Sequence, residues 1–156
     1  QKQFNQKEYK KNLIILKKKI NNKSIMVHFS DTSHWTNYEQ LPDTYYKKSL
    51  NLIKKKLGNN LEFHIFSKNI DFAKKKASMI FNNNEKLKFI GYEKLNDYEE
   101  FYLMRNYKYY IIPNSTFSWW AAYLSLKKNK LIFIPKKWYF NKTVSKDLLT
   151  TEMIKI

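Results

Sequence analysis

A hydroxyl-rich turn in the second half of the chain joins a short apolar run to a helical pattern. Residues 109–112, Tyr-Tyr-Ile-Ile, have the aromatic and β-branched composition of a strand, which a proline ends. Asn114 and Ser115 offer N-cap chemistry, so the pattern predicts a helix from about Ser115 onward. The unpaired N–H groups of its first turn, with the hydroxyls of Ser115, Thr116 and Ser118, would face the carboxyl end of a sheet. Such a helix start binds a phosphate or diphosphate without a glycine-rich loop.

The same turn also has a purely structural interpretation. Trp119 and Trp120 follow it directly, and in a capped helix both side chains would fill a hydrophobic core. Taken alone, the pattern favours this second interpretation, so the anion site needs further support.

The elements that would position the turn alternate between strand and helix. Apolar strand patterns cover residues 24–29, 61–67, 87–90, 109–112 and 131–134, and helical patterns cover residues 9–20, 44–57, 70–81, 97–106 and the stretch from 115. This alternation predicts an α/β fold with a doubly wound, mainly parallel sheet of about five strands and right-handed crossovers. We expect residues 1–23 to form an N-terminal connecting helix and residues 24–156 to form the α/β domain.

The composition limits the class of protein. A chain of 156 residues with 43% hydrophobic residues suits one domain with a sizeable core. No run of about 18 apolar residues is present, so we expect no transmembrane segment. With no cysteine and three scattered histidines, neither a disulfide framework nor a metal site is expected, and a cytoplasmic location suits the chain.

The formal charge of +17 raises the question of a nucleic-acid partner. Arg105 is the sole arginine, and the abundance of Lys, Asn and Ile is what an A+T-rich genome produces. The lysine triplets at 17–19, 54–56 and 74–76 lie inside amphipathic helical patterns, where they form solvated faces. We therefore expect no specific nucleic-acid site, but do expect attraction to anionic substrates and to membrane surfaces.

Residues 114–120, Asn-Ser-Thr-Phe-Ser-Trp-Trp, follow an apolar strand and precede residues 131–138, Leu-Ile-Phe-Ile-Pro-Lys-Lys-Trp. This arrangement closely resembles the C-terminal motif of the α-1,2-fucosyltransferases, glycosyltransferase family 11. The resemblance covers about residues 25–140 and implies the Rossmann-like, nucleotide-sugar-binding half of a GT-B-type enzyme. It implies a nucleotide-sugar donor such as GDP-fucose, a glycan acceptor, and a missing N-terminal half or partner domain. It also implies a metal-independent, inverting transfer without any other cofactor.

The first family motif, His-x-Arg-Arg-Gly-Asp, is only partly kept. Residues 27–35 read Val-His-Phe-Ser-Asp-Thr-Ser-His-Trp, so His28 matches but Ser30 and Asp31 stand where the family has paired arginines. Arginine offers phosphate a bidentate, permanently charged fork, whereas a carboxylate repels it. Three interpretations stay open: lysines such as Lys68, Lys136 and Lys137 hold the donor, the donor is not GDP-fucose, or the site is degenerate.

The second family motif, Phe-Ser-Asp-Asp, keeps its serine at Ser67, but Lys68 and Asn69 replace the acids. Asn69 is most simply the N-cap of a helix. The helix that follows residue 97 is expected to be mainly packing, with Tyr98 and Phe101 in the core.

The resemblance and the residues together define an expected site. Donor binding is assigned to His28, Ser67, Lys68, Asn114, Ser115, Thr116, Phe117 and Ser118. Asp31 and Glu39 are the loop acids that could serve as a catalytic general base, although the missing half could supply the base instead. His34 and Trp35 are candidates for acceptor binding. The expected function is transfer of a sugar to a glycan, and the alternative is a catalytically degenerate sugar- or nucleotide-binding module of a larger glycan-modifying protein.

Overall fold

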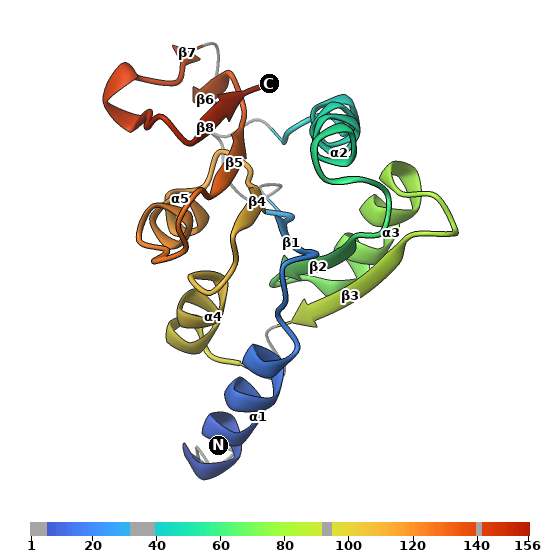
Figure 1. The fold of residues 1–156 in the computed structure, drawn as a ribbon, viewed down its shortest axis with the longest axis vertical. Helices are drawn as coiled ribbons and strands as arrows, with labels where there is room; N and C mark the ends of the chain where they lie inside the picture. The colour runs from blue at the N-terminus through green and yellow to red at the C-terminus, as the bar shows by residue number, and fades with distance from the viewer. Residues whose placement is uncertain (1–5, 32–39, 92–94, 140–141) are drawn as a thin grey trace.

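The computed structural model describes residues 6–31, 40–91, 95–139 and 142–156. Six parallel strands form one sheet in the order β3-β2-β1-β4-β5-β8 (Figure 1). The strands are β1 (Ser24–His28), β2 (Glu62–Ser67), β3 (Lys86–Gly91), β4 (Tyr109–Ile111), β5 (Leu131–Ile134) and β8 (Met153–Lys155). This confirms the predicted α/β fold with a doubly wound parallel sheet, in the strand order typical of Rossmann-like folds.

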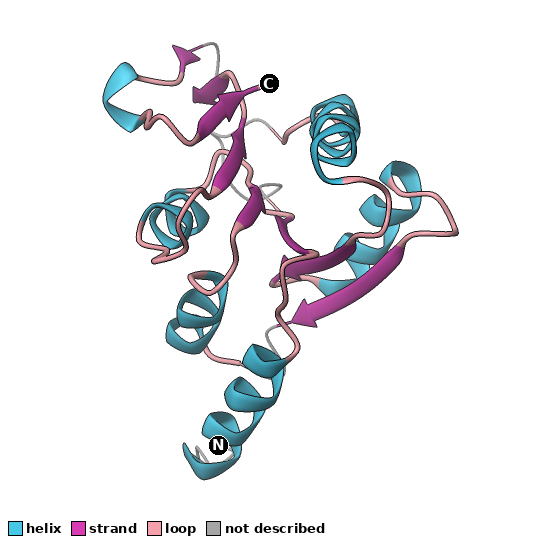
Figure 2. Cartoon of the chain, viewed as in Figure 1, coloured by secondary structure: helices cyan, strands magenta, loops and turns pink. Residues whose placement is uncertain are grey.

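Helices cover both faces of the sheet (Figures 1 and 2). Side chains of α2 and α3 pack in one core cluster, and side chains of α1, α4 and α5 pack in the other. The helices are α1 (Gln6–Lys18), α2 (Asp43–Leu57), α3 (Ile70–Ile80), α4 (Asp97–Met104), α5 (Thr116–Tyr123) and the short 3-10 helix η1 (Lys146–Leu148). That residues 1–23 form a connecting helix separate from the α/β domain stays a prediction.

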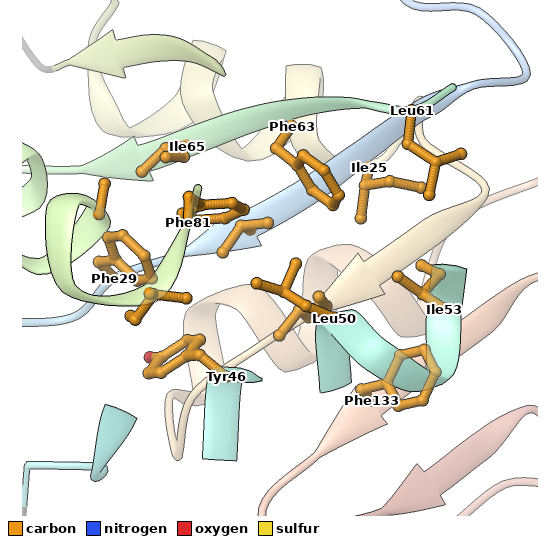
Figure 3. Close-up of a cluster of buried hydrophobic side chains, with 14 of the residues drawn as sticks. Ile25, Phe29, Tyr46, Leu50, Ile53, Leu61, Phe63, Ile65, Phe81 and Phe133 are labelled. Atoms are coloured by element: carbon orange, nitrogen blue, oxygen red, sulfur yellow. The ribbon is translucent and has the colours of Figure 1, made fainter. Parts of the chain in front are cut away.

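The two hydrophobic clusters follow from strand alternation. In β1, Ile25 and Val27 belong to the cluster that contains α2 and α3, and Met26 belongs to the opposite one. All three side chains are buried because helices cover both faces, which is why the strands appear as continuous apolar runs rather than alternating ones. Figure 3 shows the first cluster, with Phe63 and Ile65 of β2 above Leu50 and Ile53 of α2.

Local capping sets the helix starts near the site. The Asn69 side chain accepts a hydrogen bond from the Phe72 N–H at 3.0 Å, as expected of an N-cap. Asn96 and Glu99 form a reciprocal capping box at the start of α4. Both caps fix the direction in which these helices leave the carboxyl end of the sheet.

Three features of the fold differ from the prediction. Strand β8 is a sixth strand that pairs with β5, and a two-stranded hairpin of β6 (Lys137–Tyr139) and β7 (Lys142–Thr143) follows β5. The expected core position of Tyr98 is wrong, because its side chain is 76% exposed at the first turn of α4. Phe101, one turn later, does pack against the second cluster.

Candidate functional site

A pocket of about 310 Å³ lies at the carboxyl end of the sheet. The chain runs from β1 to β2 on one side and returns to β4 on the other, so the pocket lies at the switch point between β1 and β4. This is where open α/β sheets bind ligands. The described residues that line it are His28, Phe29, Ser30, Asp31, Lys68, Glu100, Asn114, Ser115, Thr116 and Phe117.

The start of α5 opens onto this pocket. Ser115 is the N-cap residue, but its side chain makes no capping hydrogen bond. The first helical bond of α5 runs from the Trp119 N–H to the Ser115 carbonyl at 3.0 Å. Helix geometry therefore leaves the N–H groups of the first turn without helical acceptors, and their partial positive charge points toward the pocket.

Three of the predicted polar site residues form hydrogen bonds within the protein itself. Ser118 is fully buried, and its hydroxyl donates to the Ser115 carbonyl at 3.4 Å. Ser67 is also buried and donates to the Asn69 carbonyl at 3.1 Å. Neither is among the pocket residues. Asn114 does line the pocket, but its amide donates to the Trp138 carbonyl at 3.0 Å.

The structural interpretation of the two tryptophans applies to only one of them. Trp119 is buried in the second cluster, and its indole N–H donates to the Leu148 carbonyl at 3.0 Å. Trp120 is 49% exposed. One face of α5 therefore packs while its N-terminus stays available to the pocket.

Two of the charged residues of the pocket, Lys68 and Asp31, have partners on neighbouring elements. Lys68 forms an exposed ion pair with Asp97 at 3.1 Å, and Asp31 accepts a hydrogen bond from the Asn69 side chain at 3.3 Å. Lys136 and Lys137, the other lysine candidates, are exposed and are not among the pocket residues. Glu39, His34 and Trp35 lie outside the described residues.

His28 ends β1 and lines the pocket with a buried ring. Burial lowers the pKa of His28 to about 4, and the nearby Lys68 adds to this effect. The ring is therefore neutral at neutral pH. Its Nδ1 atom is buried, and no hydrogen-bond partner for it exists within the described parts of the chain.

Glu100 is a pocket residue that the sequence analysis missed. Its side chain is only 4% exposed, and burial raises its pKa to about 7, with Asp97 adding to the rise and Lys68 opposing it. Glu100, Leu103 and Met104 form one buried stripe of α4. In the sequence, Glu100 precedes the apolar residues Leu103 and Met104 by three and four positions. This helical spacing places all three on one face, and it could have identified Glu100 as a buried acid.

The described residues contain neither a group of side chains suited to a metal ion nor a helix suited to cross a membrane. No three His, Cys, Asp or Glu side chains in those residues gather closely enough to hold a metal ion. None of the helices within the same ranges has the length and apolarity needed to cross a membrane.

Residues 40–151 match the profile of glycosyl transferase family 11. An Escherichia coli α-1,2-colitosyltransferase is 40% identical over 81 residues, which are 52% of this chain and 27% of that protein. The O-antigen biosynthesis glycosyltransferase WbnK of Escherichia coli is 40% identical over 47 residues, which are 30% of this chain and 16% of WbnK. These stretches are thus less than a third of each relative. No solved structure matches the chain.

Proposed function

This chain belongs to glycosyl transferase family 11, and we propose that it binds the diphosphate of a nucleotide-sugar donor in the pocket between β1 and β4. The sugar would pass from this donor to a glycan acceptor, with the remainder of the enzyme supplied by a further half or partner domain.

One observation carries the proposal: the uncapped N-terminus of α5 opens onto a pocket at the switch point of a parallel sheet. Unpaired N–H groups at a helix start favour an anion, and the positive end of the helix dipole adds to this preference. The same groups would stabilise the charge that grows on the departing diphosphate during transfer. This role suits a reaction that proceeds without a metal.

Lys68 is the cationic side chain among the described residues of the pocket. Its ion pair with Asp97 is largely exposed, with side-chain exposures of 65% and 60%, so exchanging this partner for a phosphate costs little. Lys68 is therefore the candidate, among the described pocket residues, for a lysine that takes the place of the family arginines.

The donor sugar is proposed from the relatives. GDP-fucose is the donor that the family resemblance implies, and the name of one relative adds colitose as a second candidate sugar. O-antigen biosynthesis, named for the second relative, points to a bacterial surface glycan as the acceptor.

The alternative is a degenerate binding module, and the carboxyl groups around the pocket favour it. Asp31 stands where the family has an arginine, and Glu100 adds a second acid. These groups oppose a diphosphate unless protons or cations compensate them.

Calorimetric titration with GDP tests the proposed donor site. Thr116 is exposed at the start of α5, so Thr116→Asp leaves the helix intact while placing a negative charge on the anion site. We expect GDP to bind the unmodified chain and Thr116→Asp to weaken binding at least about tenfold. Thr151→Asp is the matched control, because Thr151 is exposed, precedes the edge strand β8 and is not among the pocket residues. Equal GDP affinity of all three proteins would refute the site.

Ser30→Arg distinguishes an intact donor pocket from a degenerate one. Ser30 lines the pocket, and a charged, bidentate contact is worth about 1.5–3 kcal/mol, so the variant should bind GDP about ten- to a hundredfold more tightly. UDP titrated in parallel would show the base preference. No tightening in a folded variant would favour a pocket rebuilt around another ligand.

A further inference from the structure

We propose that Glu100 couples diphosphate binding to a proton: its carboxyl group is protonated when the pocket is occupied and donates a hydrogen bond to the ligand. This inference rests on the proposed function, because it names how the same pocket accepts a diphosphate.

Glu100 is a buried residue placed where a bound ligand could contact it. It lies in the first turn of α4, lines the pocket and is 4% exposed. Within the described ranges, its carboxyl group has no hydrogen-bond or ion-pair partner. The adjacent Glu99, by contrast, is engaged in the capping box of α4. A nearly buried carboxyl group without a protein partner is costly unless a ligand or a proton satisfies it.

The charges around the pocket also favour a protonated Glu100 when a diphosphate is bound. The chain carries a formal charge of +17, yet the charged groups around Glu100 are not predominantly positive. Lys68 reaches the pocket from the loop after β2 and is paired with Asp97 of α4 itself. Asp31 contributes another carboxyl group from the segment after β1. A diphosphate brings two further negative charges, so an ionised Glu100 would leave the filled pocket strongly anionic.

Protonation of Glu100 removes this conflict. Burial and Asp97 raise its pKa to about 7 in the empty pocket, so little free energy is needed to protonate it at neutral pH. A bound diphosphate is an additional negative charge nearby and would raise this pKa further. The proton comes from the solvent, and the resulting O–H group donates to a phosphate oxygen in a short, charge-assisted bond.

His28 does not provide the same coupling. It faces the pocket from the end of β1, but its pKa of about 4 keeps it neutral throughout the range in which Glu100 titrates. Its role in the pocket would be that of a neutral hydrogen-bonding group.

The pH dependence of GDP-fucose binding by the whole chain tests the inference. GDP-fucose is a suitable probe because both phosphates are esterified and do not titrate near neutral pH. We expect the affinity of the unmodified chain to fall about tenfold between pH 7 and pH 8.5. Glu100→Gln keeps a hydrogen-bond donor without the charge, so its affinity should change less than about twofold over this range.

Glu99→Gln is the matched control, since a glutamine preserves the capping box and the residue is not among those lining the pocket. It should keep the pH dependence of the unmodified chain. If Glu100→Gln shows the same pH dependence as the unmodified chain, or if neither depends on pH, the coupling is refuted while the donor site stands. If neither protein binds GDP-fucose or GDP at pH 5.5, both the coupling and the proposed function are refuted.

Discussion

Two buried histidines on neighbouring strands have opposite surroundings. His64 lies within β2, where its Nδ1 atom is 2.6 Å from the Tyr107 hydroxyl and its Nε2 atom is 3.1 Å from the Glu62 carboxylate. His28 ends β1 at the pocket, and its buried Nδ1 atom has no partner in the described parts of the chain. Both rings are nearly inaccessible to solvent, so burial alone does not distinguish them.

The two histidines thus separate a part of the fold that supplies its own hydrogen-bond partners from the edge of the pocket, where one buried nitrogen has none in the described residues. A buried polar network whose atoms have partners favours a rigid, well-defined structure, and both ring nitrogens of His64 have such partners. A buried polar atom that lacks a partner costs free energy, and at a pocket a ligand can satisfy it. We therefore expect substitutions in the His64 network to affect stability and substitutions at the pocket to affect binding.

The largest expected effect is that of His64→Ala. It removes a packed ring, leaves the Tyr107 hydroxyl without its partner and takes from Glu62 one of two partners, the other being Lys88. It should therefore lower the free energy of unfolding by about 4 kcal/mol. His28→Ala loses packing but no side-chain hydrogen bond to a described residue, and it should cost about half as much. Urea denaturation of both variants measures this contrast, and equal losses would remove the distinction between the two regions.

The second effect is the response of stability to pH at Glu100. Its pKa is raised from 4.5 to about 7, so its contribution to stability is fully present below pH 4.5 and is lost as pH rises through 7. Glu100→Gln avoids this loss and should be more stable than the unmodified chain by about 3 kcal/mol at pH 8, with little difference at pH 4.5. Thermal or urea unfolding at both pH values checks the sign. A variant that is less stable at pH 8 would contradict the account.

The smallest effect comes from Tyr107→Phe. This variant keeps the ring in the core but leaves the Nδ1 atom of His64 without its partner, as in His28. We expect a loss of about 1–2 kcal/mol in the free energy of unfolding and unchanged GDP affinity. A marked loss of GDP affinity on this substitution would mean that the two regions are not independent.

The sequence predicted the parts of the fold that depend on local pattern. Buried parallel strands such as residues 24–28 form continuous apolar runs, and Asn69 caps its helix through a bond three residues away. Strand β8 was missed because its three residues, Met-Ile-Lys, carry too short a pattern, and it forms only by pairing with β5. Such pairing depends on tertiary contacts that a local pattern does not contain.

The same limit applies to the candidate site. The start of α5 was predicted from capping residues, but the sequence did not reveal that Ser118 would turn inward or that Glu100 of α4 would reach the pocket. These positions depend on how α4 and α5 pack against each other. The acceptor candidates His34 and Trp35, and Glu39 as a base, stay predictions.

Binding of a diphosphate at the first turn of α5 is tested most directly by backbone amide chemical shifts. In a nitrogen-15 labelled chain titrated with GDP, we predict the largest shift changes at the N–H groups of Thr116, Phe117 and Ser118. The His64 and Tyr107 amides should remain unchanged, since their network does not line the pocket. Saturable shifts elsewhere, with these three amides unaffected, would contradict the account.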